Sequence, residues 1–381
     1  MARYQVLPTD PAAVKVWAAK VAIDAAKKSF WAAMTGTEAQ ALPCVTKTDL
    51  ESGPGDEVTT TLIAKIRGKP IEGSEKGEGR EQKLSHYTQK MRIDKHRQLV
   101  NVGDVMTQKR VNFDIGEQVR ARLSDYMAEV SDEQAFMTAA GTRGVGSEVQ
   151  HYPVGYAGFP NAFTLPDAAH RLVGDGLTSA TLTGAGKTNL STAIIDRLMV
   201  RARKQLGVET AQGARMEPIQ IPSTSGSPGM GAGKHFVLVV ANESMYDLRR
   251  EVGDAGWLTL EKAKAAAVGA QSPIFQGGDA YYNGCLITDH ETCIKMNDCT
   301  SDGTTVVPTV RNLFLGAHAI SAAYGTKTQR GGVRYELMDS DLDHGEEEVV
   351  IVRLIAGWIK NKFNGMDFGV QAADTAYTAI N

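Results

Sequence analysis

The sequence predicts an α+β fold in which helices and antiparallel strands occupy separate stretches of the chain. After Asn112, apolar residues recur at the spacing of a helix. Between residues 56 and 99, two runs rich in β-branched residues flank a polar segment. Two apolar stretches near the end of the chain are expected to be strands. Because helices and strands do not alternate regularly, we do not expect a parallel sheet built from βαβ units. We find no internal repeat, and 381 residues are enough for one large domain or two to three smaller ones.

The composition is that of an ordinary chain with a buried core. Apolar residues make up 42% and charged residues 22%, with a net charge of −3, so the basic excess of a dedicated nucleic-acid binder is absent. No apolar run reaches the roughly 18 residues that span a bilayer, and the start has no secretory signal. We therefore expect synthesis in the cytoplasm and no membrane partner. The 39 glycines indicate many turns and loops.

The chain begins with a predicted amphipathic arm. Asp10 and Pro11 can start a helix, and Gly36 is its expected end. Its apolar side chains follow helical spacing and include four large contact residues: Trp17, Val21, Phe30 and Trp31. These need something to pack on, within the subunit or on a neighbour.

A long charged hairpin is expected next, with strands at Asp56–Arg67 and Leu84–Leu99 and a polar tip at Gly68–Glu81. The tip is net acidic, and its charges are Glu72, Glu75, Lys76, Glu78, Arg80 and Glu81. The stem is basic, and its charges are Lys65, Arg67, Lys69, Lys83, Lys90, Arg92, Lys95 and Arg97. Such a hairpin is poorly stable alone, so it is suited to lie over a neighbouring subunit. The alternative is a flexible surface loop.

The strongest helix runs from Asn112 to the glycines Gly141 and Gly144. Its apolar face is flanked by charges that could meet a neighbour: Asp114, Glu117, Arg120, Arg122 and Asp125. Further elements are expected as helices at 189–206, 243–268 and the Ala-rich 312–324, and as strands at 235–241, 285–290, 304–310, 348–358 and 368–373.

One motif suggests a nucleotide-binding enzyme. Gly186, Lys187 and Thr188 resemble the end of a phosphate-binding loop, but Thr181 replaces the first glycine and no buried strand precedes the motif. Gly231–Lys234 is a second incomplete match. Without a serine, cysteine or histidine catalytic set, we expect no enzyme, no catalytic residue and no cofactor; a nucleotide-binding enzyme using Gly186-Lys187-Thr188 is the alternative.

Two stretches are weak candidates for a metal. Cys285, Cys293 and Cys299 lie near His290, but the paired C-x2-C spacing of common zinc sites is missing. The acidic run from Asp339 to Glu348 departs from a calcium loop at its sixth and twelfth positions. We expect reduced thiols and a solvated turn between strands rather than metal sites.

The order of these elements resembles the Hong Kong 97 fold of the major capsid proteins of tailed bacteriophages. Particular segments look like the N-four-like family of such proteins: KVWAAKVAIDAAKKSFWAAMTG (15–36), KTDLESGPGDEVTTTL (47–62), TQKRVNFDI (107–115), FVLVVANESMYDLRR (236–250), SPIFQGGDAYYNGCLITDHE (272–291), LFLGAHAISAAYG (313–325) and KNKFNGMDFGVQAADT (360–375). They occur in the expected order and span nearly the whole chain.

The resemblance implies a division into an N-arm (1–43), an E-loop hairpin and its base (44–101), a P-domain with a spine helix (102–242), an A-domain (243–330) and terminal strands returning to the P-domain (331–381). It implies a homo-oligomer of hexamers and pentamers in an icosahedral shell enclosing double-stranded DNA. It also implies a portal protein at one vertex, a cement or decoration protein as a candidate partner, and location in the virion after synthesis in the host bacterial cytoplasm. Since the arm begins by Asp10, we expect a separate scaffolding protein. Packaged DNA is expected to be contacted nonspecifically.

Overall fold

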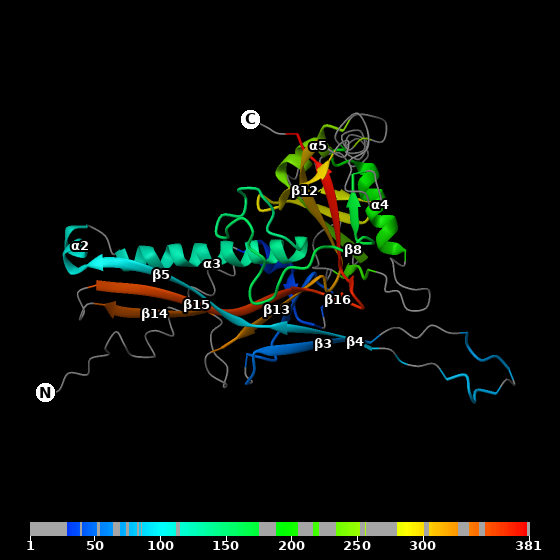
Figure 1. Cartoon of the computed structure of the whole chain (residues 1–381), viewed down its shortest axis with the longest axis horizontal. Helices are drawn as coiled ribbons and strands as arrows, with labels where there is room; N and C mark the ends of the chain where they lie inside the picture. Colours follow the sequence, from blue (N-terminus) through cyan, green and yellow to red (C-terminus); the bar gives the residue numbers. More distant parts are fainter. Residues whose placement is uncertain are drawn as a thin grey trace, which may run out of the picture.

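The computed structural model shows two large β-sheets joined by one long helix, with two small two-stranded sheets beside them (Figure 1). The structure describes residues 29–38, 40–51, 54–63, 69–73, 76–81, 84, 86–111, 115–174, 188–204, 216–220, 234–251, 256, 280–300, 305–326, 335–342 and 347–378. Among these residues, no helix combines the length and apolar character needed to cross a membrane.

The first sheet is built around the long strand β15 (Glu347–Lys360). Its other strands are β1 (Thr35–Gly36), β2 (Cys44–Lys47), β13 (Ile320–Gly325), β14 (Tyr335–Leu342) and β5 (Asp94–Asp104). The first half of β15 pairs antiparallel with both β14 and β5, and its last residues pair with β13. Val350, Val352 and Leu354 are fully buried at alternate positions, so one face of this sheet forms core, as the period of a strand requires.

Helix α3 (Ile115–Ala140) lies along this sheet, as the sequence predicted (Figure 1). Leu123 and Met127 pack into the same core as the buried residues of β15. From Asp132 to Ala140 every residue is buried, and α3 contacts β12 and β13 as well as β15. Gly141, at φ +74°, ends the helix, and its N–H donates to the carbonyl of Met137 (2.8 Å). This left-handed conformation is readily available only to glycine.

The second sheet stands at the C-terminal end of α3. Its order is β6 (Arg171–Val173), β18 (Val370–Ala376), β12 (Val306–Leu315), β8 (Lys234–Val240), β10 (Cys285–Asp289) and β9 (Ala280–Tyr282); β11 (Lys295–Thr300) also pairs with β12 and β7 (Ile219–Gln220) with β8. Helices α4 (Thr192–Arg203) and α5 (Asn242–Arg249) pack on one face. Phe236 and Leu238 of β8 face α4, while Val237 and Val239 join the core around α3. Burial on both faces explains the continuous apolar run of this strand.

The predicted Ala-rich helix at 312–324 is wrong. The segment is the end of β12, a turn, and β13, with Leu313–Leu315 and Ile320–Ala323 buried. A strand that is buried on both faces carries no alternating pattern, and a short apolar run cannot then be told from a buried helix. The sheet partners on both sides, β18 and β8 for β12, and β15 and β2 for β13, decide the conformation.

The remaining short elements correct two further boundaries. Residues 10–28 of the predicted first helix lie outside the described residues, and its end is the 3-10 helix η1 (Phe30–Met34) followed by β1, so Gly36 is in a strand. The return strand of the hairpin is split: β3 (Glu57–Ile63) pairs with β4 (His86–Arg92), and after Ile93 the chain continues as β5 in the first sheet. Helix α2 (Val105–Arg110) and the small pair β16 (Lys362–Phe363) and β17 (Met366–Asp367) complete the described elements. The division into five named domains stays a prediction.

Candidate assembly surfaces

The base of the N-arm is fixed within its own subunit. Trp31 is 3% exposed, and its ring meets Phe136 of α3 edge-on at 5.2 Å between centroids. Phe30 stacks on Phe136 (5.7 Å) and lies 4.5 Å from the ring of His290. The sequence left open whether these two aromatic residues pack within the subunit or on a neighbour, and the structure places both within it. Trp17 and Val21 lie outside the described residues.

Asp132 of α3 holds this base by hydrogen bonds. Its carboxylate accepts from Ser29 Oγ (2.6 Å), Phe30 N (2.8 Å) and Trp31 N (3.4 Å). Burial raises the pKa of Asp132, while these hydrogen bonds oppose the shift. Burial lowers the pKa of His290, which favours the neutral ring between Phe30 and Phe136. The sequence did not indicate that an aspartate within the spine helix would accept hydrogen bonds from the base of the arm.

The hairpin β3–β4 forms a two-stranded sheet of its own, and the described residues 69–73 and 76–81 beyond it lie away from both larger sheets (Figure 1). Only its base is buried, where Val58 pairs with Met91. Glu57 binds Lys90 (2.7 Å) and Arg92 (3.2 Å), and these hydrogen bonds lower the pKa of Glu57. Both cations remain mostly exposed, since their side chains keep 73% and 68% of their accessible surface.

Two amide side chains attach the hairpin to the body. Gln89 donates to the carbonyl of Lys360 (2.9 Å) and accepts from the N–H of Lys362 (2.8 Å). Asn161 forms the same reciprocal pair with the backbone of Arg92, at 2.8 and 3.0 Å. The backbone of Arg92 passes so close to Gly357 that a Cβ there would lie 2.0 Å from its carbonyl oxygen. The hairpin therefore has a fixed base, which composition alone could not indicate.

The predicted contact residues of the hairpin divide into four groups. Lys69, Glu72, Lys76, Glu78, Arg80 and Glu81 are exposed on the described part of the tip, Arg92 lies on β4, and Glu75 and Lys83 lie outside the described residues. Lys95 and Arg97 belong to β5 rather than to the hairpin stem, which corrects the sequence interpretation; both are exposed there. Lys69 and Glu72 approach each other at 3.8 Å, an exposed pair of little energetic weight.

The charged residues predicted on the spine helix differ in how exposed they are to a neighbouring subunit. Arg120 is turned toward its own sheet, 3.2 Å from Asp339 of β14 and 3.8 Å from Glu348 of β15. Arg122 is 82% exposed and lies 3.5 Å from Asp125. Glu117 is exposed in the first turn of α3, and Asp114 lies outside the described residues.

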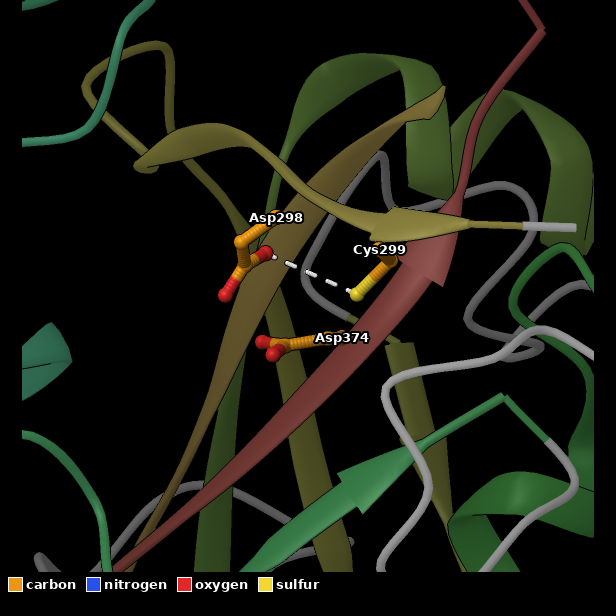
Figure 2. A group of neighbouring side chains, drawn as sticks. All are labelled: Asp298, Cys299 and Asp374. Carbon is orange, nitrogen blue, oxygen red and sulfur yellow. Dashed lines mark hydrogen bonds between the residues drawn. The ribbon is translucent and has the colours of Figure 1, made fainter. Parts of the chain in front are cut away.

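The candidate zinc residues are not brought together. Among the described residues, the group with metal-ligand spacing is instead Asp298, Cys299 and Asp374 (Figure 2). Its oxygens already have cationic partners: Arg171 reaches both aspartates at 2.7 Å, and Arg311 binds Asp374 through Nε (2.7 Å) and a second nitrogen (2.8 Å). Burial raises the pKa of the Cys299 thiol to about 11, which disfavours the thiolate that a metal needs. This cluster is a largely buried ionic network, with Asp298 at its exposed side, that joins β6, β11, β12 and β18.

Other candidate chemistry finds little support in the described residues. The acidic run at Asp339–Glu348 is a strand pair, β14 and β15, around residues 343–346, which lie outside the described residues. Gly186 and Lys187 of the phosphate-loop candidate also lie outside them. Thr188 is described, and its backbone carbonyl accepts a hydrogen bond from the N–H of Ala376 (3.0 Å). Thr188 therefore lies beside β18 of the second sheet.

Comparison with known proteins identifies the family. A family model described as phage capsid protein matches residues 6–379. The capsid protein of Ralstonia phage GP4 has a similar structure, with a TM-score of 0.78 and 32% identity over 100% of both chains. The capsid of cyanophage Pam1 has a TM-score of 0.67 at 17% identity, covering 93% of this chain and 94% of the other. The head of Helicobacter pylori bacteriophage KHP40 gives 0.64 at 14%, covering 91% of each chain. No curated protein matches the chain.

These comparisons agree with the described fold and cover nearly the whole chain. The two more distant structures show the same mixed α and β fold, and the Ralstonia phage capsid shares both fold and sequence along its full length. The family match leaves only the first five and last two residues uncovered. The chain therefore belongs to the phage capsid protein family, and it is a major capsid protein, a subunit of the shell of a bacteriophage head.

Proposed function

We propose that this capsid protein assembles as hexamers and pentamers into an icosahedral shell around double-stranded DNA, and that its hairpin makes the contact between neighbouring subunits. The observation that carries this is the hairpin itself, a separate two-stranded sheet with a fixed base and an exposed, charged far end. A two-stranded hairpin gains too little burial to be stable alone in water. A neighbouring subunit supplies the missing surface.

Charge complementarity gives this contact its direction. The exposed cations Lys90, Arg92 and Lys95 form a basic strip from the hairpin base onto β5. Glu117 and Asp125 of a neighbour's spine helix are suitable acidic partners, while the acidic hairpin tip meets a basic patch that includes Arg122. Arg120 contributes less, because its side chain is only 17% exposed and points toward its own sheet. Each exposed pair is worth about 0–1 kcal/mol, but a shell repeats it at every subunit, and complementary charges also exclude wrong registers.

Charge reversal tests the contact. The variant Arg92→Glu with Lys95→Glu should lose closed shells at low salt, scored by electron microscopy and sedimentation. The matched control Lys109→Glu with Arg110→Glu changes the charge equally on exposed residues of α2 and should assemble normally. Partial recovery on adding Glu117→Lys would assign the partner. Normal shell yield from the first variant would refute the proposed contact.

The further partners follow from the resemblance. A separate scaffolding protein, a portal protein at one vertex and a cement or decoration protein are proposed as partners of the shell. Packaged DNA is proposed to be contacted weakly and without sequence preference, because the chain carries a net charge of −3 and nonspecific binding depends on phosphate neutralisation. Filter binding at increasing salt should show weak, salt-sensitive retention; a salt-resistant preference for one sequence would contradict this.

A purely structural role, without catalysis, is part of the same proposal. Membership of a capsid family supports it, and no comparison favours the nucleotide-binding alternative. Equilibrium dialysis with ATP, on wild type and Lys187→Ala, tests the point directly. Specific binding that Lys187→Ala abolishes would favour the alternative.

A further inference from the structure

A cavity of about 740 Å³ lies beside the base of the arm, between the middle of α3, residues 147–150 and residues 290–292. We call it the acidic groove, because six carboxylates line it: Asp125, Glu129, Asp132, Glu133, Glu148 and Glu291. Arg122 also lines it. Six carboxylates against one arginine leave a formal charge of −5 when the histidine of the wall, His290, is neutral.

The deep carboxylates of the groove already have partners. Glu133 accepts from the backbone N–H groups of Gln150 (2.8 Å) and His151 (3.2 Å), and Glu148 lies 2.5 Å from Lys295. Those toward the mouth are more open: the side chain of Glu129 is 62% exposed, and Glu291 is also exposed. The groove therefore presents negative charge to whatever occupies it.

The arm leaves the body at this groove. Asp132 and His290, which hold Ser29 and Phe30, are both part of its wall. Lys27 and Lys28 come directly before Ser29 in the sequence. Two extended residues span at most about 7 Å, and this tether is short enough for either lysine to reach the groove.

We propose that the acidic groove binds Lys27 and Lys28 of the same chain. The tether and the opposite charges support this occupant over a free cation or a second copy. The segment before Ser29 is basic, with Arg3, Lys15, Lys20, Lys27 and Lys28 against Asp10 and Asp24. The aromatic pair Phe30 and Trp31 fixes where the arm begins, and the lysine contact fixes the direction in which it leaves. This docking within one subunit goes beyond the proposed hairpin contact and does not depend on it.

Zero-length coupling of amines to carboxylates tests the assignment. A mixture of isotopically light and heavy unassembled subunits is treated with carbodiimide and analysed by mass spectrometry. We expect links from Lys27 or Lys28 to Glu129, Asp125 or Glu291, within subunits of one isotope. Absence of these links would overturn the proposal, and so would links to Glu129 or Glu291 that are mixed-isotope or that come from Lys90 or Lys95, because these would place a second copy in the groove.

A charge swap supplies an independent readout. Lys27→Glu with Lys28→Glu should abolish the links and lower the yield of regular shells several-fold. Lys15→Glu with Lys20→Glu is the matched control, with the same change of charge farther along the arm, and should lower the yield less. Adding Glu129→Lys and Glu291→Lys to the first variant exchanges the two charges, and both residues are exposed, so the subunit should still fold. Recovery of most of the yield is expected; equal loss in the first variant and its control, or no recovery, would overturn the assignment.

Discussion

The buried network around Asp374 predicts an unequal cost for removing its two main partners. Arg311 and Asp374 are 0% and 1% exposed, and Arg311 also donates to the carbonyl of Ala140 (2.9 Å) at the end of α3. Asp374→Asn leaves Arg311 buried, with Asp298 at 3.8 Å as its nearest remaining carboxylate in the network. An uncompensated buried charge costs about 3–5 kcal/mol.

Arg311→Met should cost less. Asp374 keeps Arg171, whose Nε lies 2.7 Å from it, so its charge stays compensated. The loss is then that of hydrogen bonds and of the link to α3, about 1–3 kcal/mol. Because the two residues share one network, the double variant should cost less than the two single costs combined.

Urea unfolding of the purified, unassembled subunit, followed by circular dichroism, measures all three variants. The expected order of destabilisation is Asp374→Asn above Arg311→Met, with the double variant below the sum of both. Equal or reversed costs, or strict additivity, would refute the reasoning that Arg171 compensates Asp374 closely, while only the more distant Asp298 remains for Arg311.

Three further outcomes are expected. Replacing Gly68–Glu81 with a short Gly-Ser linker should change the unfolding free energy by less than about 1 kcal/mol, because the described residues there are exposed, yet it should block shells. Gly141→Ala should lower stability by about 2–4 kcal/mol, because the residue has φ +74° and its Cβ would lie 2.2 Å from the carbonyl oxygen of Thr164. Stability should rise by about 1 kcal/mol from pH 7 to 9 relative to Lys360→Met: burial lowers the pKa of Lys360 from 10.5 to about 8, so the unfolded chain binds more protons in this range.

Each of these has its own control. Unfolding of the linker variant would place the tip in the core. Gly155→Ala shares a positive φ (+90°) but meets nothing within 4 Å, so it should cost only about 1–2 kcal/mol; equal costs would remove the contact with Thr164 as the cause. The comparison with Lys360→Met cancels other groups whose unfolded-state pKa lies near 9, such as Cys44, whose pKa burial raises from 9.0 to about 11. Parallel stability profiles for wild type and Lys360→Met would show that the burial of this amine is not what controls the slope.

The local pattern of apolar residues was sufficient to predict the helices and strands that bury one face. The spine helix, the strands of the hairpin and β15 were predicted because their buried residues recur at 3.6 or 2 positions, and that recurrence survives in the linear sequence. The resemblance to tailed-phage capsid proteins also came from the sequence alone, since it rests on segments in order, and the family comparison confirms it. Phe30 and Trp31 were expected to need a packing surface because large apolar side chains need burial, but the sequence did not show that Phe136 of the same subunit provides it.

Tertiary structure alone decided the rest, because it depends on partners far apart in the chain. Whether 312–324 is helix or strand depended on β8, β18, β2 and β15, which cover it on both sides. The break after Arg92 depends on Asn161 and on the approach to Gly357, more than sixty residues away. The acidic groove likewise combines α3 with residues 147–150 and 290–292. The sequence indicates which residues favour burial or solvent. The contacts of a charged residue, an amide or a glycine depend on the atoms that folding brings next to it, and these come from distant parts of the chain.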